Sequence, residues 1–323
     1  MRIKSFAKIN LGLEVLSKRE DGYHDIKTVF QSVDLFDVLR IARRDDSDIV
    51  LAGSDPSIPW DETNLVYRAA RMLQQESGVR RGADIYVEKN IPPGKGLGGG
   101  SSNAAMTLWT LSRLWELPED KAGLLRLAAR LGADVPYFLE GGLCLGTGRG
   151  DILAPLQERL SRVCLLVLPS FPIPTARVYG ALTEGLTRSP TLPRPKGGDE
   201  KRGSGLTPNK PRHSCRGVEG LTSGGKAGKI DAFLRTEELR FLDNELEETI
   251  FRLFPQIKGI KSLIQSLGPE LSLVSGSGSA VFGLFRERAT AEAALETVGA
   301  KHRAVLVEFV SRGRYWAELN AGV

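Results

Sequence analysis

The sequence has few cysteines and no long apolar run. Its three cysteines, Cys144, Cys164 and Cys215, are too few and too far apart for a disulfide framework or for the close spacing of a metal site. No stretch of about 18 apolar residues occurs, so we expect no membrane-spanning helix. The first residues also lack the compact apolar core and cleavage site of a signal peptide. These absences predict a cytoplasmic protein that does not contact a membrane.

Aromatic residues are missing where basic residues are densest. Residues 188–229 contain ten Lys or Arg and three Asp or Glu, a net charge of +7 against +5 for the whole chain, so the rest carries −2. A nucleic-acid-binding protein would need a basic face on a domain, or a basic arm interleaved with aromatics. This segment has nine Gly, five Pro and no apolar periodicity. We therefore expect a flexible, solvated loop and no nucleic-acid partner.

Strands and helices alternate through the rest of the chain. Period-two and period-3.6 apolar patterns and turn residues distinguish them. We expect strands over residues 3–15, 28–33, 38–41, 83–89, 162–168, 271–274, 280–285 and 304–310. We expect helices after an Asn64 cap, over residues 104–115, over 124–131 up to Gly132, over 257–267 and over 291–298, and a capping box from Asn244 to Glu247. The fold class is α+β, with an N-terminal domain of residues 1–154 and a C-terminal domain of residues 155–323.

The segment from Pro93 to Ala105 has the composition of a phosphate-binding loop. It lies between a strand and a helix and reads PGKGLGGGSSNAA. Glycine lets the backbone approach a ligand closely, and the start of the next helix presents free N–H groups and a positive dipole end. A glycine-rich helix entry with a Ser cap is the plain structural alternative, but five glycines in seven positions exceed what a cap needs. The Gly-Lys-Ser/Thr ending of a P-loop is missing, and G-x-G-x-x-G is met at Gly94, Gly96 and Gly99 without the acidic residue of a dinucleotide site.

Five segments together resemble the GHMP kinases. Residues 93–105 are similar to the second motif of that family, P-x-x-x-G-L-G-S-S-A-A, and residues 275–279 are similar to its third motif, a glycine turn. The others are residues 7–11, 21–24 and 131–136. With the extra glycines of GLGGGSSNAA, they resemble the branch that uses ATP to phosphorylate the 2-hydroxyl of a cytidine diphosphate sugar alcohol in non-mevalonate isoprenoid precursor synthesis.

The resemblance implies a fold and two ligands. The fold would have an N-terminal domain like the second domain of ribosomal protein S5 and a ferredoxin-like C-terminal antiparallel sheet with helices. The ligands would be ATP and Mg²⁺. The residues expected to contact ATP are Pro93, Gly94, Gly96, Leu97, Gly98, Gly99, Gly100, Ser101, Ser102 and Asn103. No carboxylate cluster with metal spacing stands out, so Ser102 is the only metal ligand we suggest.

The resemblance also implies a catalytic pair. Asp134 would be the base that accepts the proton of the acceptor hydroxyl, and Lys8 would offset the developing negative charge. Asn10 shares a strand face with Lys8 and would orient the substrate. From the residues alone, Asp134 could equally cap the turn before Pro136, and Lys8 could be a solvated strand lysine.

Three further residues are expected to hold the cytidine end of the substrate. Tyr23 and His24 follow an Asp-Gly turn that would present them as a pair, and by the resemblance His24 reads the edge of the cytosine. Tyr179 matches the position of a stacking aromatic in this branch, although a partly buried helix residue is an equal alternative.

Other functions stay open at this point. A homoserine or mevalonate kinase of the same family would keep the glycine loop but lack the Gly-Tyr-His segment. A nicotinamide oxidoreductase would bind NAD(P)H and use no ATP, and a non-catalytic sugar sensor would lack Asp134 or Lys8. The partner expected is therefore a small-molecule substrate, and the protein could be a monomer or a homodimer.

Overall fold

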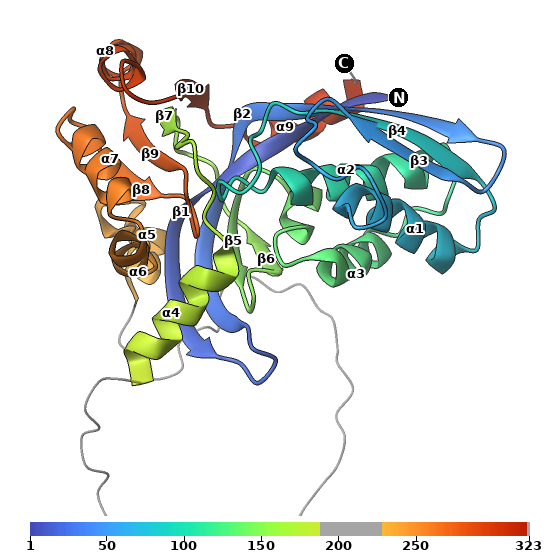
Figure 1. The fold of residues 1–323 in the computed structure, drawn as a ribbon, viewed down its shortest axis with the longest axis horizontal. Helices are drawn as coiled ribbons and strands as arrows, with labels where there is room; N and C mark the ends of the chain where they lie inside the picture. Colours follow the sequence, from blue (N-terminus) through green and yellow to red (C-terminus); the bar gives the residue numbers. More distant parts are fainter. Residues whose placement is uncertain (188–227, 322–323) are drawn as a thin grey trace, which may run out of the picture.

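The computed structural model describes residues 1–187 and 228–321, which form two β-sheets with helices packed against each of them (Figure 1). Residues 188–227, nearly all of the basic segment predicted as a loop, lie outside the described residues. Within the described ranges, no helix is long and apolar enough to cross a lipid bilayer.

The first sheet carries the two longest strands. Its strands lie in the order β3–β4–β2–β5–β6, with β1 paired to β2 off this path. β3 runs parallel to β4, whereas the other pairs are antiparallel. The strands are β1 (Arg2–Lys18), β2 (His24–Arg44), β3 (Ile49–Gly53), β4 (Gly82–Glu88), β5 (Leu143–Thr147) and β6 (Ile152–Pro155).

β1 and β2 form one long antiparallel hairpin. The sequence predicted separate strands at residues 28–33 and 38–41, which was wrong, because both lie within β2. Phe6 pairs with Phe36 but Ala7 pairs with Val33, so β2 inserts two extra residues at this bulge. A bulge bends a strand without ending it, and hydrophobic alternation alone does not distinguish the two cases.

Helices cover one face of the first sheet. Figure 1 shows α1, α2 and α3 together on that side. The Asn64 side chain accepts a hydrogen bond from Val66 N and caps the next helix, as predicted, and another helix ends directly before Gly132. The helices of this part are α1 (Leu65–Ser77), α2 (Gly99–Leu114), α3 (Lys121–Leu131), the 3-10 helix η1 (Pro136–Leu139) and the C-terminal α9 (Arg312–Ala321).

The second sheet is antiparallel, in the order β10–β7–β9–β8. Its strands are β7 (Val163–Val167), β8 (Leu271–Val274), β9 (Val281–Phe285) and β10 (Ala304–Glu308). The accompanying helices are α4 (Thr175–Thr187), α5 (Lys229–Thr236), η2 (Leu239–Phe241), α6 (Glu247–Leu253), α7 (Pro255–Gln265) and α8 (Arg288–Gly299). Helical segments separate β7 from β8, and α8 separates β9 from β10, as in a split β-α-β arrangement. The predicted antiparallel C-terminal sheet with helices is confirmed.

Strand β1 joins the two parts of the molecule. Its apolar residues Ala7 and Ile9 belong to one buried cluster with Leu166 of β7 and Phe282 of β9. Residues at alternate positions of a strand point to opposite faces, so the same packing turns Lys8 and Asn10 away from this cluster. The predicted domain boundary between residues 154 and 155 falls inside β6 and stays a prediction.

A buried ion pair fixes the entrance to the glycine loop. The carboxylate of Asp37 on β2 is fully buried, pairs with Lys89 and accepts hydrogen bonds from the N–H groups of Asn90 and Ile91, at 2.7 and 2.8 Å. These residues lead directly from β4 into the loop at residues 93–98. Removing one partner of such a pair leaves the other charge buried without compensation.

We predict that Asp37→Asn lowers the free energy of unfolding by roughly 3–5 kcal/mol, because Lys89 loses its counter-charge inside the protein. Urea unfolding followed by circular dichroism measures this. Asp46→Asn is the matched control, because the Asp46 side chain is 49% exposed in its pair with Arg44, and such pairs contribute at most about 1 kcal/mol. If the two variants lose equal stability, the buried pair does not anchor the loop.

Candidate active site

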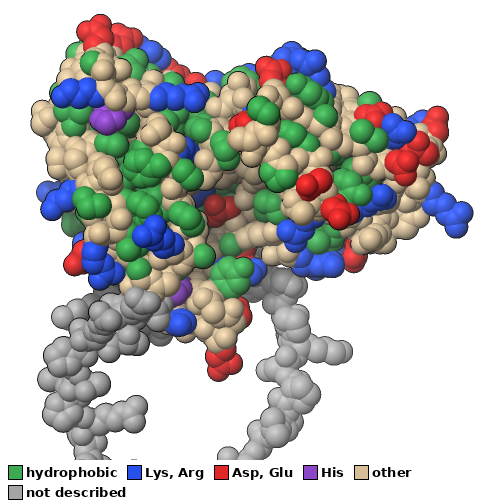
Figure 2. All heavy atoms as spheres, in the orientation of Figure 1, with side chains coloured by type: hydrophobic (Ala, Val, Ile, Leu, Met, Phe, Trp, Pro, Cys, Tyr) green, Lys and Arg blue, Asp and Glu red, His purple; other side chains and the backbone are tan. Residues whose placement is uncertain are grey.

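The surface is hollowed between the two parts of the molecule, and an acidic side chain lies in this hollow (Figure 2). β1 passes between the two parts, with its apolar residues in the cluster shared by both sheets. The polar side chains on its other face are buried as well: Lys8 is 3% exposed and Asn10 is 2% exposed. The plain alternative of a solvated strand lysine is therefore excluded for Lys8.

Lys8 and Asp134 lie together, although 125 residues separate them in the sequence. The Lys8 Nζ atom is 3.3 Å from Asp134 Oδ2, and the Lys8 side chain is 4% exposed while that of Asp134 is 37% exposed. Asp134 is not the cap of η1, because that helix begins after Val135 and has no side-chain cap hydrogen bond. The carboxylate is thus paired with an ammonium group on one side and open to solvent on the other.

Further contacts hold the Lys8 ammonium group in place. Its Nζ donates a hydrogen bond to Asn10 Oδ1 at 2.7 Å and lies 5.3 Å from the centroid of the Phe30 ring. Asn10 Nδ2 in turn donates to Thr28 Oγ1 at 2.8 Å. The predicted common face of Lys8 and Asn10 is confirmed. Because Asn10 is fixed on both sides, it also fixes the position of Lys8.

The glycine loop has the backbone of an anion-binding loop. Gly94, Gly96 and Gly98 have φ values of +69°, +73° and +71°, a region that other residues rarely adopt. A Cβ atom on Gly98 would lie 2.6 Å from the Phe138 ring, so only glycine fits between the loop and η1. α2 begins at Gly99, and its first three N–H groups have no partner within the helix. They are available to a phosphate group.

The loop also meets the second glycine turn, residues 275–279, backbone to backbone. A Cβ atom on Gly96 would lie 2.2 Å from the carbonyl oxygen of Ser275. The Ser275 hydroxyl donates to Gly96 O at 3.0 Å, and Ala280 N donates to Lys95 O at 3.1 Å. Asn10 N donates to Ser275 Oγ at 3.3 Å. The two glycine segments and β1 are therefore one connected unit.

A pocket of about 430 Å³ opens beside the glycine loop. This volume lies within the usual range of small-molecule sites. One wall contains Pro93, the loop glycines, Ser101 and Asn103, and the other is the segment from Ser57 to Leu65, which ends at the first residue of α1. Lys89 also lines the pocket, and its Nζ would lie 3.2 Å from a Cβ atom on Gly99, at the start of α2. Our sequence reasoning missed Lys89 and the second wall, which has no periodic pattern.

Ser102, the suggested magnesium ligand, is fully buried, and its hydroxyl accepts a hydrogen bond from Ser5 at 2.7 Å. Its hydroxyl is therefore not among the groups that line the pocket beside the glycine loop. Among residues 1–187 and 228–321, no group of three or more His, Cys, Asp or Glu side chains is arranged to hold one. The magnesium role of Ser102 stays a prediction.

His24 and Tyr179 meet at the other end of the site. Their ring centroids are 5.1 Å apart at an angle of 33° between the rings. Burial, followed by the charge of Lys18, lowers the pKa of His24, which favours the neutral imidazole with one donor and one acceptor nitrogen. Burial raises the pKa of Tyr179, and the nearby Asp134 carboxylate raises it further.

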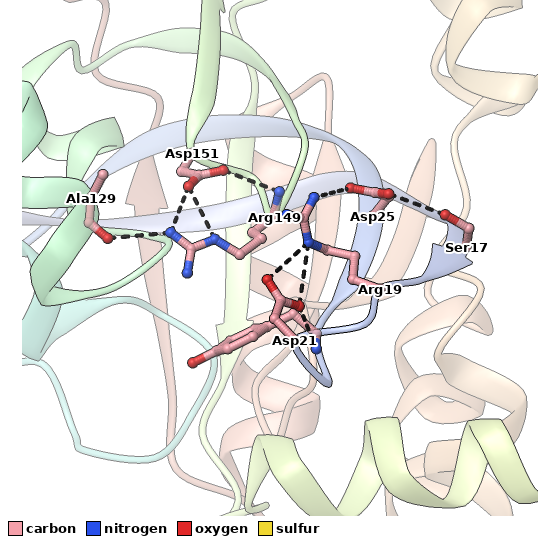
Figure 3. Close-up of polar contacts among 8 residues, drawn as sticks. Ser17, Arg19, Asp21, Asp25, Ala129, Arg149 and Asp151 are labelled. Carbon is pink, nitrogen blue, oxygen red and sulfur yellow. Dashed lines mark hydrogen bonds and ion pairs between the residues drawn. The ribbon is translucent and has the colours of Figure 1, made fainter. Parts of the chain in front are cut away.

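Tyr23 lies at the tip of the β1–β2 hairpin and is 55% exposed. An ionic network shapes this tip (Figure 3): Arg19 pairs with Asp21 and Asp25, and Asp21 Oδ1 accepts a hydrogen bond from Tyr23 N at 3.1 Å. The sequence predicted that the turn presents Tyr23 and His24 together. In the structure the Tyr23 side chain is exposed, whereas the His24 side chain is buried.

The Asn244 side chain has a different role from the one predicted from the sequence. The capping box predicted with Glu247 is wrong, because Glu247 accepts from Val274 N at 2.8 Å and pairs with Lys261. Asn244 Nδ2 donates instead to the carbonyl oxygens of Val274 and Gly276, at 2.9 and 2.7 Å. It holds the second glycine turn beside Lys8.

Comparison with known families gives two matches. Residues 64–142 match the model of the GHMP kinases N terminal domain, which contains the glycine loop and Asp134. Residues 229–304 match the model of the GHMP kinases C terminal domain, which contains the second glycine turn.

Individual proteins agree with these matches. The chain is 37% identical over 302 residues to a 4-diphosphocytidyl-2-C-methyl-D-erythritol kinase from Chlorobium phaeovibrioides, which covers 93% of each chain. A kinase of the same name from Thermodesulfovibrio yellowstonii is also 37% identical, over 91% of this chain and 92% of its own.

Solved structures show the same relationship. A crystal structure of 4-(cytidine 5'-diphospho)-2C-methyl-D-erythritol kinase, 33% identical, superposes with a TM-score of 0.72 over 96% of this chain and 99% of that one. A homoserine kinase from Cytophaga hutchinsonii shares only the fold, with 16% identity and a TM-score of 0.67 over 96% of this chain and 95% of its own. The chain belongs to the GHMP kinases and, within them, to the 4-diphosphocytidyl-2-C-methyl-D-erythritol kinases.

Proposed function

We propose that this protein transfers the γ-phosphoryl group of ATP to the 2-hydroxyl of 4-diphosphocytidyl-2-C-methyl-D-erythritol, a step in isoprenoid precursor synthesis. The observation that carries the proposal is the ion pair between Lys8 and Asp134, whose Nζ and Oδ2 atoms are 3.3 Å apart. Lys8 lies on β1, and its backbone N–H donates a hydrogen bond to Leu97 O in the glycine loop. A phosphoryl-transfer site needs an acceptor for the hydroxyl proton and a place for the phosphates. Relatives with this activity in their names align over more than nine-tenths of the chain.

The transfer would take place where the two glycine segments meet β1. The free N–H groups at the start of α2 would hold the phosphates of ATP, and the pocket at Ser57–Leu65 would hold its nucleoside. Asp134 would accept the hydroxyl proton as the oxygen attacks the γ-phosphorus and the bond to the ADP oxygen breaks. Lys8, 3.3 Å away, would stabilise the negative charge on the attacking oxygen. ATP would bind as its Mg²⁺ complex, and the ion would supply neutralisation of the negative charge on the phosphates.

The cytidine end of the substrate would lie at the aromatic end of the site. The neutral imidazole of His24 offers one donor and one acceptor to the edge of the cytosine. Tyr179 and Tyr23 would stack on the base, an interaction of about 1–3 kcal/mol where it has been measured. Burial raises the pKa of Tyr179 and the Asp134 carboxylate raises it further, which supports recognition of the base close to the proposed chemistry.

The alternatives have less support. Homoserine and mevalonate kinases share the fold at 11–17% identity, and an oxidoreductase does not belong to this family. The cytoplasmic location and the oligomeric state, a monomer or a homodimer, stay predictions from the sequence.

A coupled ADP-release assay tests the function. We expect phosphorylation of 4-diphosphocytidyl-2-C-methyl-D-erythritol and a kcat/KM at least a hundredfold lower with mevalonate or homoserine, because a site built to bind a base rejects ligands that leave its polar groups unpaired. Equal activity with either of the other two would refute the proposed substrate.

We predict that Asp134→Asn lowers kcat by a factor of about 10²–10⁴, because an amide cannot accept the hydroxyl proton. Lys8→Met should also lower kcat, and the double variant should lose less than the product of the two effects, since the pair acts as a unit. Asp120→Asn is the control, because Asp120 caps α3 far from the pair and keeps a capping oxygen. If Asp134→Asn retains more than about a tenth of the wild-type kcat, Asp134 is not the base.

His24→Ala and Tyr179→Ala should raise KM for the cytidine substrate by about tenfold or more each and leave KM for ATP within twofold, because both side chains lie at the substrate end of the site. Steady-state kinetics with each substrate varied in turn measures this. Tyr67→Ala is a control for loss of a tyrosine, since Tyr67 lies on α1 and packs against the apolar core between the first sheet and its helices. An equal rise in both KM values would contradict the assignment.

A further inference from the structure

The turn between β5 and β6 carries an arginine that faces the hairpin tip. Gly148 and Gly150, on either side of Arg149, have φ values of +67° and +96°. Gly148 O accepts a hydrogen bond from Ile26 N at 2.7 Å, so this turn is bound to the β1–β2 hairpin just beyond Tyr23 and His24. The guanidinium of Arg149 lies over the Tyr23 ring, 5.3 Å from its centroid.

The Arg149 side chain is fixed by two other groups. Its Nε and Nη2 atoms donate to Asp151 Oδ2 at 3.1 and 2.7 Å, and Nη2 also donates to the carbonyl oxygen of Ala129 on α3 at 3.3 Å. Asp151 Oδ1 accepts from Arg149 N at 3.1 Å, which closes the turn. Figure 3 shows Arg149 between Asp151 and Ala129, beside the Arg19–Asp21 network of the hairpin.

The hydrogen bonds of Arg149 hold its guanidinium group where it can support the Tyr23 ring. Arg149 is 26% exposed and Asp151 is 16% exposed, so the pair is partly shielded from solvent. A guanidinium over an aromatic face attracts it by about 0.5–2 kcal/mol, depending on how far it is desolvated. The Tyr23 backbone is held by Asp21 and Arg19, but its exposed ring has Arg149 as a partner from a different part of the chain.

We propose that Arg149 is a positioning residue for recognition of the cytosine: clamped by Asp151 and Ala129, it holds the Tyr23 ring in the orientation that stacks on the base. The inference rests on the proposed function. Arg149 acts through Tyr23 and does not touch the substrate. The clamp at Ala129 lies on α3, the helix that precedes the segment with Asp134.

Kinetics of four variants tests this. Arg149→Met should raise KM for the cytidine substrate by about twofold to thirtyfold, with kcat and KM for ATP unchanged, since the attraction lost is worth about 0.5–2 kcal/mol. Tyr23→Ala should raise the same KM. In the Tyr23→Ala, Arg149→Met double variant, the second change should add less than twofold, because its target is gone. Asp151→Asn, which loosens the clamp only, should raise the same KM to a smaller extent.

Arg130→Met is the matched control, because Arg130 lies next to Ala129 on α3, its side chain is 59% exposed, and it pairs with Glu76 instead of the hairpin tip. It should leave KM unchanged. An unchanged KM in both Arg149→Met and Asp151→Asn would overturn the inference. So would an undiminished effect of Arg149→Met in the Tyr23→Ala background, which would mean direct contact with the substrate. A wild-type protein that does not phosphorylate the cytidine substrate would refute the proposed function, and this inference with it.

Discussion

An ammonium group inside a protein must be surrounded by acceptors or opposite charge, because removing it from water without them costs many kcal/mol. Lys8 meets this condition with Asp134 from the segment after α3 and Asn10 from its own strand. Asn10 is held by Thr28 of β2 and by Ser275 of the second glycine turn. The burial of this one side chain therefore requires four segments, distant in the sequence, to be in place together.

Glycine makes that assembly possible at its narrowest points. The loop at residues 93–98 and the turn at residues 275–279 approach so closely that a methyl group on Gly96 would overlap the backbone of Ser275. Asn244 holds the turn through hydrogen bonds from its side-chain amide to the carbonyl oxygens of Val274 and Gly276. Asp37 holds the residues that enter the loop. The proposed phosphate site and the proposed catalytic pair are thus parts of one connected unit, which suits phosphoryl transfer because that reaction depends mainly on positioning.

Features set by local sequence could be predicted. The alternation of β1 placed Lys8 and Asn10 on one face, and the density of glycine before α2 indicated an anion site. Features set by long-range packing could not be predicted. In the sequence Lys89 is an ordinary lysine at the end of a strand, and only the fold brings Asp37 beside it. Asn244 followed by Glu247 has the spacing of a capping box, but tertiary contacts engage the amide nitrogen of Asn244 and the carboxylate of Glu247 instead. The proximity of Asp134 and Lys8 was expected from a family resemblance, since nothing in their spacing implies it.

The central claim is that this site transfers the γ-phosphoryl group of ATP to the 2-hydroxyl of the cytidine substrate and to no other acceptor. The product formed from ATP and 4-diphosphocytidyl-2-C-methyl-D-erythritol, analysed by phosphorus NMR with proton coupling, tests it most directly. The account predicts one new phosphomonoester, on the 2-hydroxyl, formed in equal amount to ADP. Release of ADP and inorganic phosphate without this ester, or phosphate distributed over several hydroxyls, would contradict it.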